Sequence, residues 1–104
     1  MKITIFDNSL EEFIWSLEKS TVAKVLRTID LLEEFGQLLG PSHSKKVAPR
    51  LFELRIQGTQ QVRIFYTFHK SQIILFRGFI KKSRRIPQRE IRIALKKLKE
   101  LDNV

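Results

Sequence analysis

Two arginines in neighbouring predicted strands are the residues whose spacing best suggests chemistry. Residues 51–57 and 62–68 both alternate in side-chain character and are separated by a turn sequence, which predicts a β-hairpin. In the natural register of this hairpin, Arg55 lies directly opposite Arg63 on one face. Because like charges in that position destabilise a sheet, we expect either an anion between the guanidinium groups or a compensating charge from Glu53. The alternative is that both arginines lie on a solvated face, where their stems merely cover apolar surface.

Two further groups of cations flank this hairpin. The first group is Lys81, Lys82, Arg84 and Arg85. It follows a predicted strand, and a loop at the end of a rigid sheet is a usual place for a working site. The second group is the loop pair Lys45 and Lys46. Short basic runs are also common on solvated surfaces, so the plainer alternative is that they have no specific role.

Positive charge is concentrated in the second part of the chain. Residues 1–40 carry four basic and seven acidic side chains, a net charge of −3. Residues 41–104 carry sixteen basic and four acidic side chains, a net charge of +12, and the whole chain has +9. This excess favours a polyanion or an acidic protein as partner.

Most catalytic and metal-binding patterns are missing from the sequence. The chain has no cysteine, and its two histidines, His43 and His69, are far apart, so we expect neither a thiolate nucleophile nor a metal site. Glycine-rich phosphate loops, nucleophile elbows and suitably spaced carboxylate pairs are also absent, and no cofactor is expected. The sequence shows neither a membrane span nor a signal peptide, which favours a cytoplasmic location.

An enzyme built from these residues would have to work with lysine and arginine. Cleavage of RNA by its own 2′-OH suits such a site, because this reaction needs no metal. The attacking hydroxyl must be deprotonated, the charge of the pentavalent phosphate stabilised and the leaving 5′-oxygen protonated. Fixed guanidinium groups can stabilise the phosphate charge. A lysine among other cations can act as acid or base, because its neighbours disfavour its own charge.

Two helices are predicted in the first part of the chain. Asn8 or Ser9 caps the first, whose apolar side chains recur at helical spacing. The second starts at Ser20 or Thr21 and ends at Gly36, where a left-handed cap is favourable. Because the link between them is short, we expect an antiparallel helical hairpin.

The remaining pattern predicts a small sheet and a last helix. The predicted strands cover residues 2–6, 51–57, 62–68 and 73–80. Residues 36–50 read as a loop, and a final amphipathic helix follows Pro87. The fold class is therefore α+β: one domain over residues 1–104, with the helical hairpin on a mainly antiparallel sheet of about four strands and a C-terminal helix. Helices are expected to cover one face of the sheet and to leave the other open.

Alternation also assigns side chains to the two faces. The apolar rows pair in the expected register as Ile56 with Val62, Leu54 with Ile64, and Phe52 with Tyr66. Tyr66 is therefore expected on the core side, with its hydroxyl at an edge. Trp15 is expected in the core rather than as a platform for stacking bases.

Several stretches of the chain carry a family resemblance. In order, they are GPSHSKKV, LFELRI, VRIFY, GFIKKSRRIP and REIRIALKKLKEL. Together they resemble the phage-derived HigB-like toxins of the RelE/ParE superfamily. The resemblance implies a RelE-like α+β toxin of a type II toxin–antitoxin system, bound by an antitoxin that carries a helix-turn-helix domain. Members of the RelE and HigB type cut mRNA on the ribosome, so the implied activity is that of a ribosome-dependent mRNA endonuclease.

The resemblance also implies roles for individual residues. Arg55 matches the arginine that ends the first hairpin strand, and Arg63 matches the one that contacts the scissile phosphate in RelE-like enzymes. Lys81 and Lys82 match the basic pair after the last strand, which makes these four the implied catalytic residues. The implied RNA-binding residues are Lys45, Lys46, Arg84 and Arg85. Residues 86–88 (Ile-Pro-Gln) occupy the area where RelE has a catalytic tyrosine.

Other functions remain open at this point. The chain could be a non-nucleolytic toxin similar to ParE, which acts on DNA gyrase, or an inactive member that only binds its antitoxin. A third alternative is a free-standing RNA-binding domain. The first of these predicts intact message with DNA damage, and the third predicts tight RNA binding without ribosomes.

Overall fold

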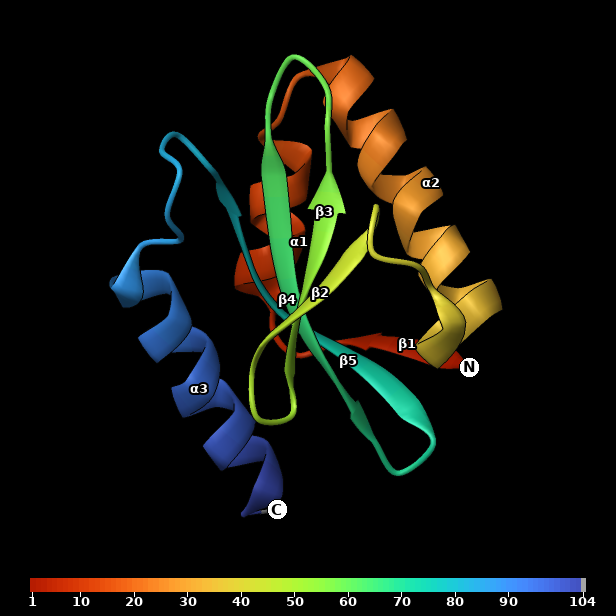
Figure 1. Cartoon of the computed structure of the whole chain (residues 1–104), viewed down its shortest axis with the longest axis vertical. Helices are drawn as coiled ribbons and strands as arrows, with labels where there is room; N and C mark the ends of the chain where they lie inside the picture. The colour runs from red at the N-terminus through yellow and green to blue at the C-terminus, as the bar shows by residue number, and fades with distance from the viewer. Residues whose placement is uncertain (104) are drawn as a thin grey trace.

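The computed structural model describes residues 1–103, and its centre is a five-stranded sheet (Figure 1). The strands are β1 (Lys2–Ile5), β2 (Ser44–Ala48), β3 (Leu51–Ile56), β4 (Val62–His69) and β5 (Gln72–Ile80). The helices are α1 (Asn8–Trp15), α2 (Lys19–Phe35) and α3 (Gln88–Asp102), with a short 3-10 turn, η1 (Gly36–Leu38), after α2. The strand order is β1-β5-β4-β3-β2, with β1 parallel to β5 and all other neighbours antiparallel.

The predicted hairpin register is confirmed. β3 and β4 pair with Arg55 opposite Arg63, and the three apolar pairs lie in the expected positions. The turn between these strands fixes this register. A slip of one residue would move every apolar side chain to the other face. The positions of the two arginines therefore follow from the same pattern that builds the core.

The predicted strand count of about four is wrong by one. Residues 44–48, inside the predicted loop at 36–50, form β2 and pair antiparallel with β3. This strand is short, lies at the sheet edge and contains two lysines, features that weaken a strand pattern in the sequence. The N-terminal strand does join the sheet, as a parallel edge strand beside β5.

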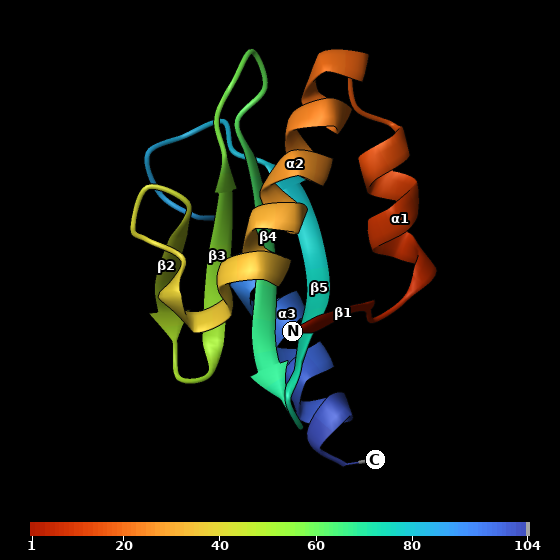
Figure 2. The same cartoon turned by 90° about the vertical axis from the view of Figure 1, so that its right-hand side faces the viewer.

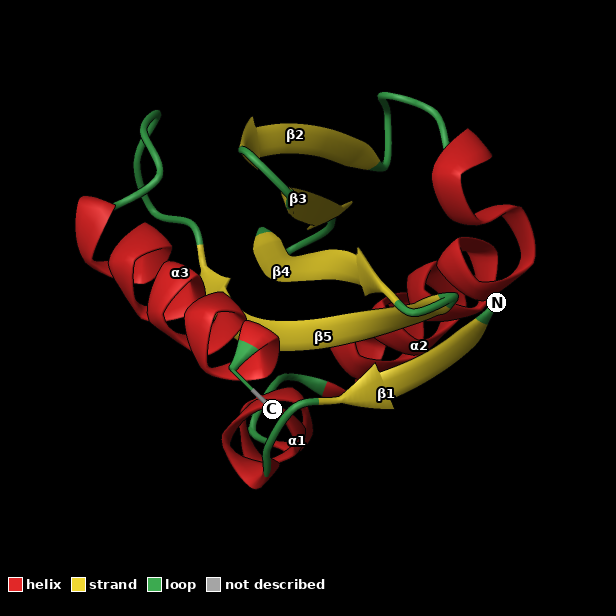
Figure 3. Cartoon of the chain, turned by 90° about the horizontal axis from the view of Figure 1, so that it is seen from below, coloured by secondary structure: helices red, strands yellow, loops and turns green. Residues whose placement is uncertain are grey.

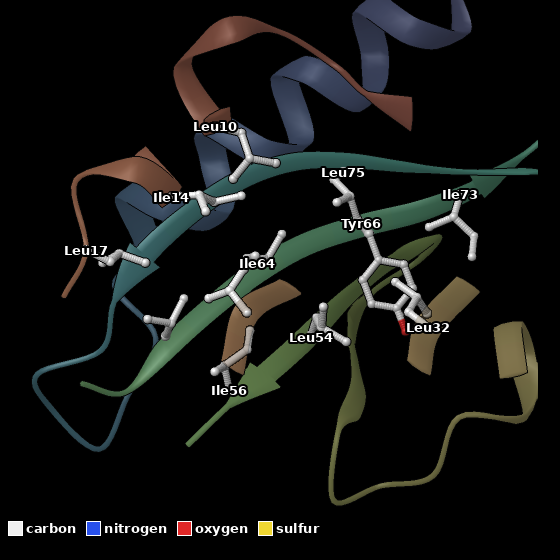
Figure 4. Packing of buried hydrophobic residues seen from close by; sticks show 12 residues of the cluster. Leu10, Ile14, Leu17, Leu32, Leu54, Ile56, Ile64, Tyr66, Ile73 and Leu75 are labelled. Atoms are coloured by element: carbon white, nitrogen blue, oxygen red, sulfur yellow. The ribbon is translucent and has the colours of Figure 1, made fainter. Parts of the chain in front are cut away.

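Helices α1 and α2 both pack on the first face of the sheet, around the apolar cluster drawn in Figure 4. They run in opposite directions, but they splay apart (Figure 2): α1 lies over β5 and α2 over β3, so the predicted hairpin is looser than expected. A Cβ atom at Gly78 would lie 2.6 Å from the Phe13 ring, which shows how closely α1 approaches β5. Asp7, rather than Asn8 or Ser9, caps α1 and accepts a hydrogen bond from the backbone N–H of Ser9.

The second face of the sheet is not fully open, contrary to the prediction. Helix α3 packs on it, so that α2 and α3 flank opposite faces (Figure 3). Ala94 and Leu98 of α3 pack with Phe65, Phe76 and a few neighbouring apolar side chains. This second cluster covers only part of the face, and the remainder lies beside the loop that joins β5 to α3. The amphipathic pattern of the last helix was visible in the sequence, but not the face on which it would pack.

Trp15 is also placed differently from the prediction. It lies at the end of α1 with 64% of its surface exposed, so it is not a core residue. The apolar stripe of α1 consists of Leu10, Phe13 and Ile14, and Leu17 just after the helix packs in the same cluster. Trp15 follows Ile14 directly and therefore points about 100° away from it around the helix. Among residues 1–103, no helix is long and apolar enough to cross a membrane.

Candidate nucleic-acid interface

Glu53 lies between the two facing arginines and is buried with them. Its carboxylate contacts the Arg63 guanidinium, with Oε1 at 3.0 Å from Nε, and the Arg55 guanidinium, with Oε2 at 3.5 Å from Nε. The side chains of Glu53 and Arg63 are 1% and 6% exposed, whereas that of Arg55 is 27% exposed. Of the two arrangements expected for the arginine pair, the structure contains the compensating carboxylate. One negative charge serves two cations, so the cluster retains a net positive charge.

Arg55 and Arg63 differ in what they can reach. Arg63 is packed inside, where one terminal nitrogen donates to the Val62 carbonyl at 3.0 Å. Burial lowers the pKa of the Arg63 guanidinium from its usual value; the charge of Glu53 opposes this shift, and that of Arg55 adds to it. Arg63 therefore contacts Glu53 from the interior of the protein, while Arg55 remains accessible to a ligand.

Arg55 opens into a cleft of about 550 Å³ on the α3 side of the sheet. We call this the basic cleft. Its lining residues are Lys45, Glu53, Arg55, Lys81, Arg84, Arg85, Ile86, Gln88 and Ile91. Five of these nine side chains are basic and one is acidic. The cleft therefore brings together β2, β3, the loop after β5 and the start of α3.

Local backbone structure fixes two of these cations. Lys45 pairs with Glu53 across β2 and β3, so both side chains face the same side of the sheet. The backbone N–H of Lys81 donates to the Gln61 carbonyl at 2.7 Å, which extends the pairing of β5 with β4 by one residue. These contacts hold Lys45 and Lys81 at the rim of the cleft, whereas Arg84 and Arg85 come from the exposed loop.

Three of the eight predicted site residues, Lys46, Lys82 and Arg63, do not line the basic cleft. Lys46 is next to Lys45 on a strand and pairs with Phe52, so it faces the opposite side of the sheet. Lys82 lines a different cavity, of about 420 Å³, between α1 and the start of α3. Each of these lysines is adjacent in sequence to a residue of the cleft. Strand alternation separates Lys46 from Lys45, and the turn after β5 separates Lys82 from Lys81. Arg63 lies beneath the cleft floor.

The sequence did not identify the part that α3 plays in the cleft. Ile86, Gln88 and Ile91 line it, and their position depends on the packing of α3 against the second face. Tyr66 is on the other side of the sheet, where its hydroxyl forms a hydrogen bond with the Ser44 hydroxyl, as its predicted core position requires. Burial raises the pKa of Tyr66, and the hydrogen bond from Ser44 partly opposes the shift. Among residues 1–103, no group of three His, Cys, Asp or Glu side chains could hold a metal ion.

Comparison with known proteins identifies the family. Residues 12–99 match the family described as "Phage derived protein Gp49-like (DUF891)". The chain belongs to this Gp49-like family. The match includes both hairpin strands, the basic loop and most of α3, and thus every residue of the basic cleft. A search of curated protein sequences gives no significant match.

A solved structure shows the fold type of this Gp49-like chain. A chain of the archaeal RelE–RelB complex from Pyrococcus horikoshii OT3 superposes with a TM-score of 0.55 and 16% sequence identity. The alignment covers 81% of the present chain and 97% of the archaeal one. The predicted RelE-like α+β fold is therefore confirmed at the level of overall architecture.

The geometry of the cleft suits a phosphodiester. Arginine and lysine donors converge from separate elements on one concave surface, and the single carboxylate there is already paired with two guanidinium groups. Among residues 1–103, no aromatic side chain lines the cleft, so these residues offer no platform on which a base could stack. The arrangement can therefore bind the backbone of a nucleic acid without selecting its bases.

Proposed function

We propose that this Gp49-like protein is the toxin of a type II toxin–antitoxin system and acts as a ribosome-dependent mRNA endonuclease. The observation that carries the proposal is the convergence of Arg55, Lys81, Lys45, Arg84 and Arg85 on one cleft. Membership in the Gp49-like family and the RelE-like fold support the assignment to this class. The activity and the role of each residue are our inference from the cleft.

The reaction is attack of an RNA 2′-OH, whose proton is lost to solvent water, on the adjacent phosphorus. The O2′–P bond forms, the P–O5′ bond breaks, and the products are a 2′,3′-cyclic phosphate and a free 5′-OH. Arg55 donates to the non-bridging oxygens, where negative charge grows in the transition state. We assign protonation of the leaving 5′-oxygen to Lys81, which lines the cleft, and no catalytic step to Lys82, which lines a different cavity.

Glu53 and Arg63 act through Arg55 in this mechanism. Glu53 contacts the Arg55 guanidinium and restricts its orientation, and Arg63 compensates the carboxylate from inside. Both are positioning residues, because Arg63 is too deeply buried to touch a phosphate in the cleft. This revises the direct phosphate contact that the family resemblance implies for Arg63.

The ribosome is proposed as the structure that presents the message. The cleft recognises backbone charge and offers no stacking platform for bases, so something else must hold the message in an extended conformation. Ribosomal RNA is also the polyanion that the +9 net charge would attract. The remaining partner is an antitoxin, a proposal supported by the RelE–RelB complex whose fold this chain shares. We expect its gene to lie next to that of the toxin and to encode a helix-turn-helix domain.

Induced expression in bacteria tests the proposal. The unaltered protein should arrest growth, and mapping of mRNA 5′ ends should show cuts within translated codons. Arg55→Ala should abolish both effects, because loss of one transition-state donor costs about 10²–10³-fold in rate. Lys46→Ala is the matched control, since it removes one positive charge from the opposite face of the sheet.

Three outcomes would contradict this proposal. Cuts that persist at full frequency in Arg55→Ala would show that the basic cleft is not the site. Intact message with DNA breaks after induction of the unaltered protein would instead favour a toxin that acts on DNA gyrase. Normal growth without cuts or breaks would favour an inactive antitoxin-binding protein.

A further inference from the structure

A second cationic pocket lies on the other side of Arg55. It has a volume of about 310 Å³ and is formed by α2, the end of β3 and the loop before β2. We call it the α2 pocket. Its lining residues are Lys24, Arg27, Thr28, Leu31, Ser42, His43, Arg55, Ile56 and Gln57. Three of these side chains are basic and none is acidic, although the first forty residues as a whole have a net charge of −3.

Two cations of this pocket, Lys24 and Arg27, are not neutralised by a carboxylate of residues 1–103. The ammonium group of Lys24 donates to the Gln57 carbonyl at 3.3 Å, which holds it at the end of β3. Among the described residues, neither Lys24 nor Arg27 forms an ion pair. Thr28 and Ser42 add hydroxyl groups to the same lining. The Thr28 hydroxyl already donates to the Lys24 carbonyl at 2.7 Å. The surface is suited to an anion because two solvent-exposed cations line it and no carboxylate is among the described lining residues.

Arg55 joins the α2 pocket to the basic cleft. It borders both, and its backbone N–H donates to the carbonyl of His43, the residue just before β2 begins, at 2.8 Å. The side chain of His43 forms a hydrogen bond with Ser42 through Nδ1, at 3.1 Å from Oγ. Because β2 begins at Ser44, its pairing with β3 does not extend past Arg55, and a chain of phosphates could pass around the end of β3 from one cavity into the other.

We infer that the α2 pocket is a second phosphate subsite, which binds the RNA backbone next to the phosphodiester held in the basic cleft. This inference rests on the proposed function, since it assigns a longer RNA footprint to the same site. Lys24 and Arg27 would bind phosphate oxygens, and Arg55 would lie between the two bound phosphates. Residues 1–40, although acidic overall, would thus contribute two cations of α2 to the surface that binds RNA.

The test is the salt dependence of binding to a single-stranded RNA hexanucleotide. Substitution with 2′-deoxy nucleotides prevents cleavage, and fluorescence anisotropy reports the affinity. For single-stranded nucleic acid, the slope of log affinity against log salt decreases in magnitude by about 0.7 for each phosphate that the protein no longer neutralises. We expect Lys24→Ala/Arg27→Ala to reduce the slope by one to two such steps and to weaken binding at low salt.

Two further double variants make the result decisive. Lys70→Ala/Lys99→Ala removes the same charge from the turn between β4 and β5 and from α3, away from both cavities. Lys45→Ala/Arg84→Ala removes two positive charges from the basic cleft. If only the cleft variant differs from the Lys70/Lys99 control, the α2 pocket is not a subsite and the proposed function stands. If neither cavity variant differs from that control, both proposals fail.

Discussion

The two faces of the sheet differ most clearly along β4. One face presents Val62, Ile64 and Tyr66 to a continuous apolar cluster sealed by α1 and α2 (Figure 4). The other face presents Arg63 and Phe65. Arg63 belongs to the charged cluster beside the basic cleft, whereas Phe65 packs in the apolar cluster with α3. A single strand therefore supplies a rigid core on one side and charged groups on the other. The fold can place cations with accuracy because the opposite face is well packed.

The faces also differ in how they affect stability. Burial of apolar side chains such as Leu54 and Ile64 stabilises the fold by about 1.5–3 kcal/mol each. Burial of Glu53 and Arg63 requires two charges to leave water, a penalty that their mutual attraction often only offsets. We therefore attribute the charged cluster to function rather than to stability. Substitutions on each face can therefore separate effects on stability from effects on function.

The largest expected effect is that of Arg63→Ala. The substitution leaves the buried carboxylate of Glu53 with only the partly exposed Arg55 as partner, and breaking a buried ion pair in this way costs about 3–5 kcal/mol. Denaturant unfolding of the purified protein measures the loss. Arg55→Ala, which removes the more accessible cation from the same carboxylate, should cost much less. Equal losses in both variants would show that Arg63 has no special structural role.

Next in size is Leu54→Ala, between Glu53 and Arg55 but on the opposite face. Leu54 is fully buried, and removal of its side chain should lower the free energy of unfolding by about 2–5 kcal/mol. RNA affinity measured on the folded protein should remain unchanged, because the cleft loses no charge. Leu38→Ala is the control, since Leu38 is 86% exposed and should contribute almost nothing. A weaker RNA affinity of folded Leu54→Ala would mean that the faces are not independent.

The contrast between the faces could largely be predicted from the sequence, because it depends on alternation. The positions of Arg55 and Arg63, and the option that Glu53 compensates them, follow from the hairpin register. Local pattern did not reveal β2, because an edge strand of five residues with two lysines is weak in propensity. Lysines adjacent in sequence were likewise grouped, although strand alternation separates Lys45 from Lys46.

Tertiary packing explains the other differences. The sequence predicts an amphipathic last helix, but only the assembled fold places it against the second cluster, where Ile91 and Gln88 close the cleft. The α2 pocket was missed for the same reason. Lys24 and Arg27 belong to an acidic segment, and only the packing of α2 beside β3 brings them next to Arg55. Composition averaged over a segment conceals such a local group.

A smaller effect is expected for Tyr66→Phe, which removes one hydrogen bond from the apolar face. Without the hydrogen bond to the Ser44 hydroxyl, the free energy of unfolding should fall by about 0.5–1.5 kcal/mol. Growth arrest should be unaffected, because the hydroxyl lies on the side of the sheet away from the basic cleft. Loss of toxicity at normal expression would contradict the assignment of the reaction to the second face.

The smallest effect concerns the ion pair that joins α1 and α3 across the sheet edge, where Lys97 Nζ lies 2.9 Å from Asp7 Oδ2. Burial alone would raise the pKa of Asp7, but the hydrogen bonds from Ser9 and Lys97 outweigh it, and the pKa is lowered. A lowered carboxyl pKa stabilises the fold above the ordinary value of about 3.9, and this contribution is lost as the pH falls through the folded-state value. Because Asp7 is 39% exposed, we expect only about 0.2–1 kcal/mol. Asp7→Asn keeps a capping side chain, so its stability difference from the unaltered protein should be present at neutral pH and vanish in acid; a difference independent of pH would contradict a charge effect.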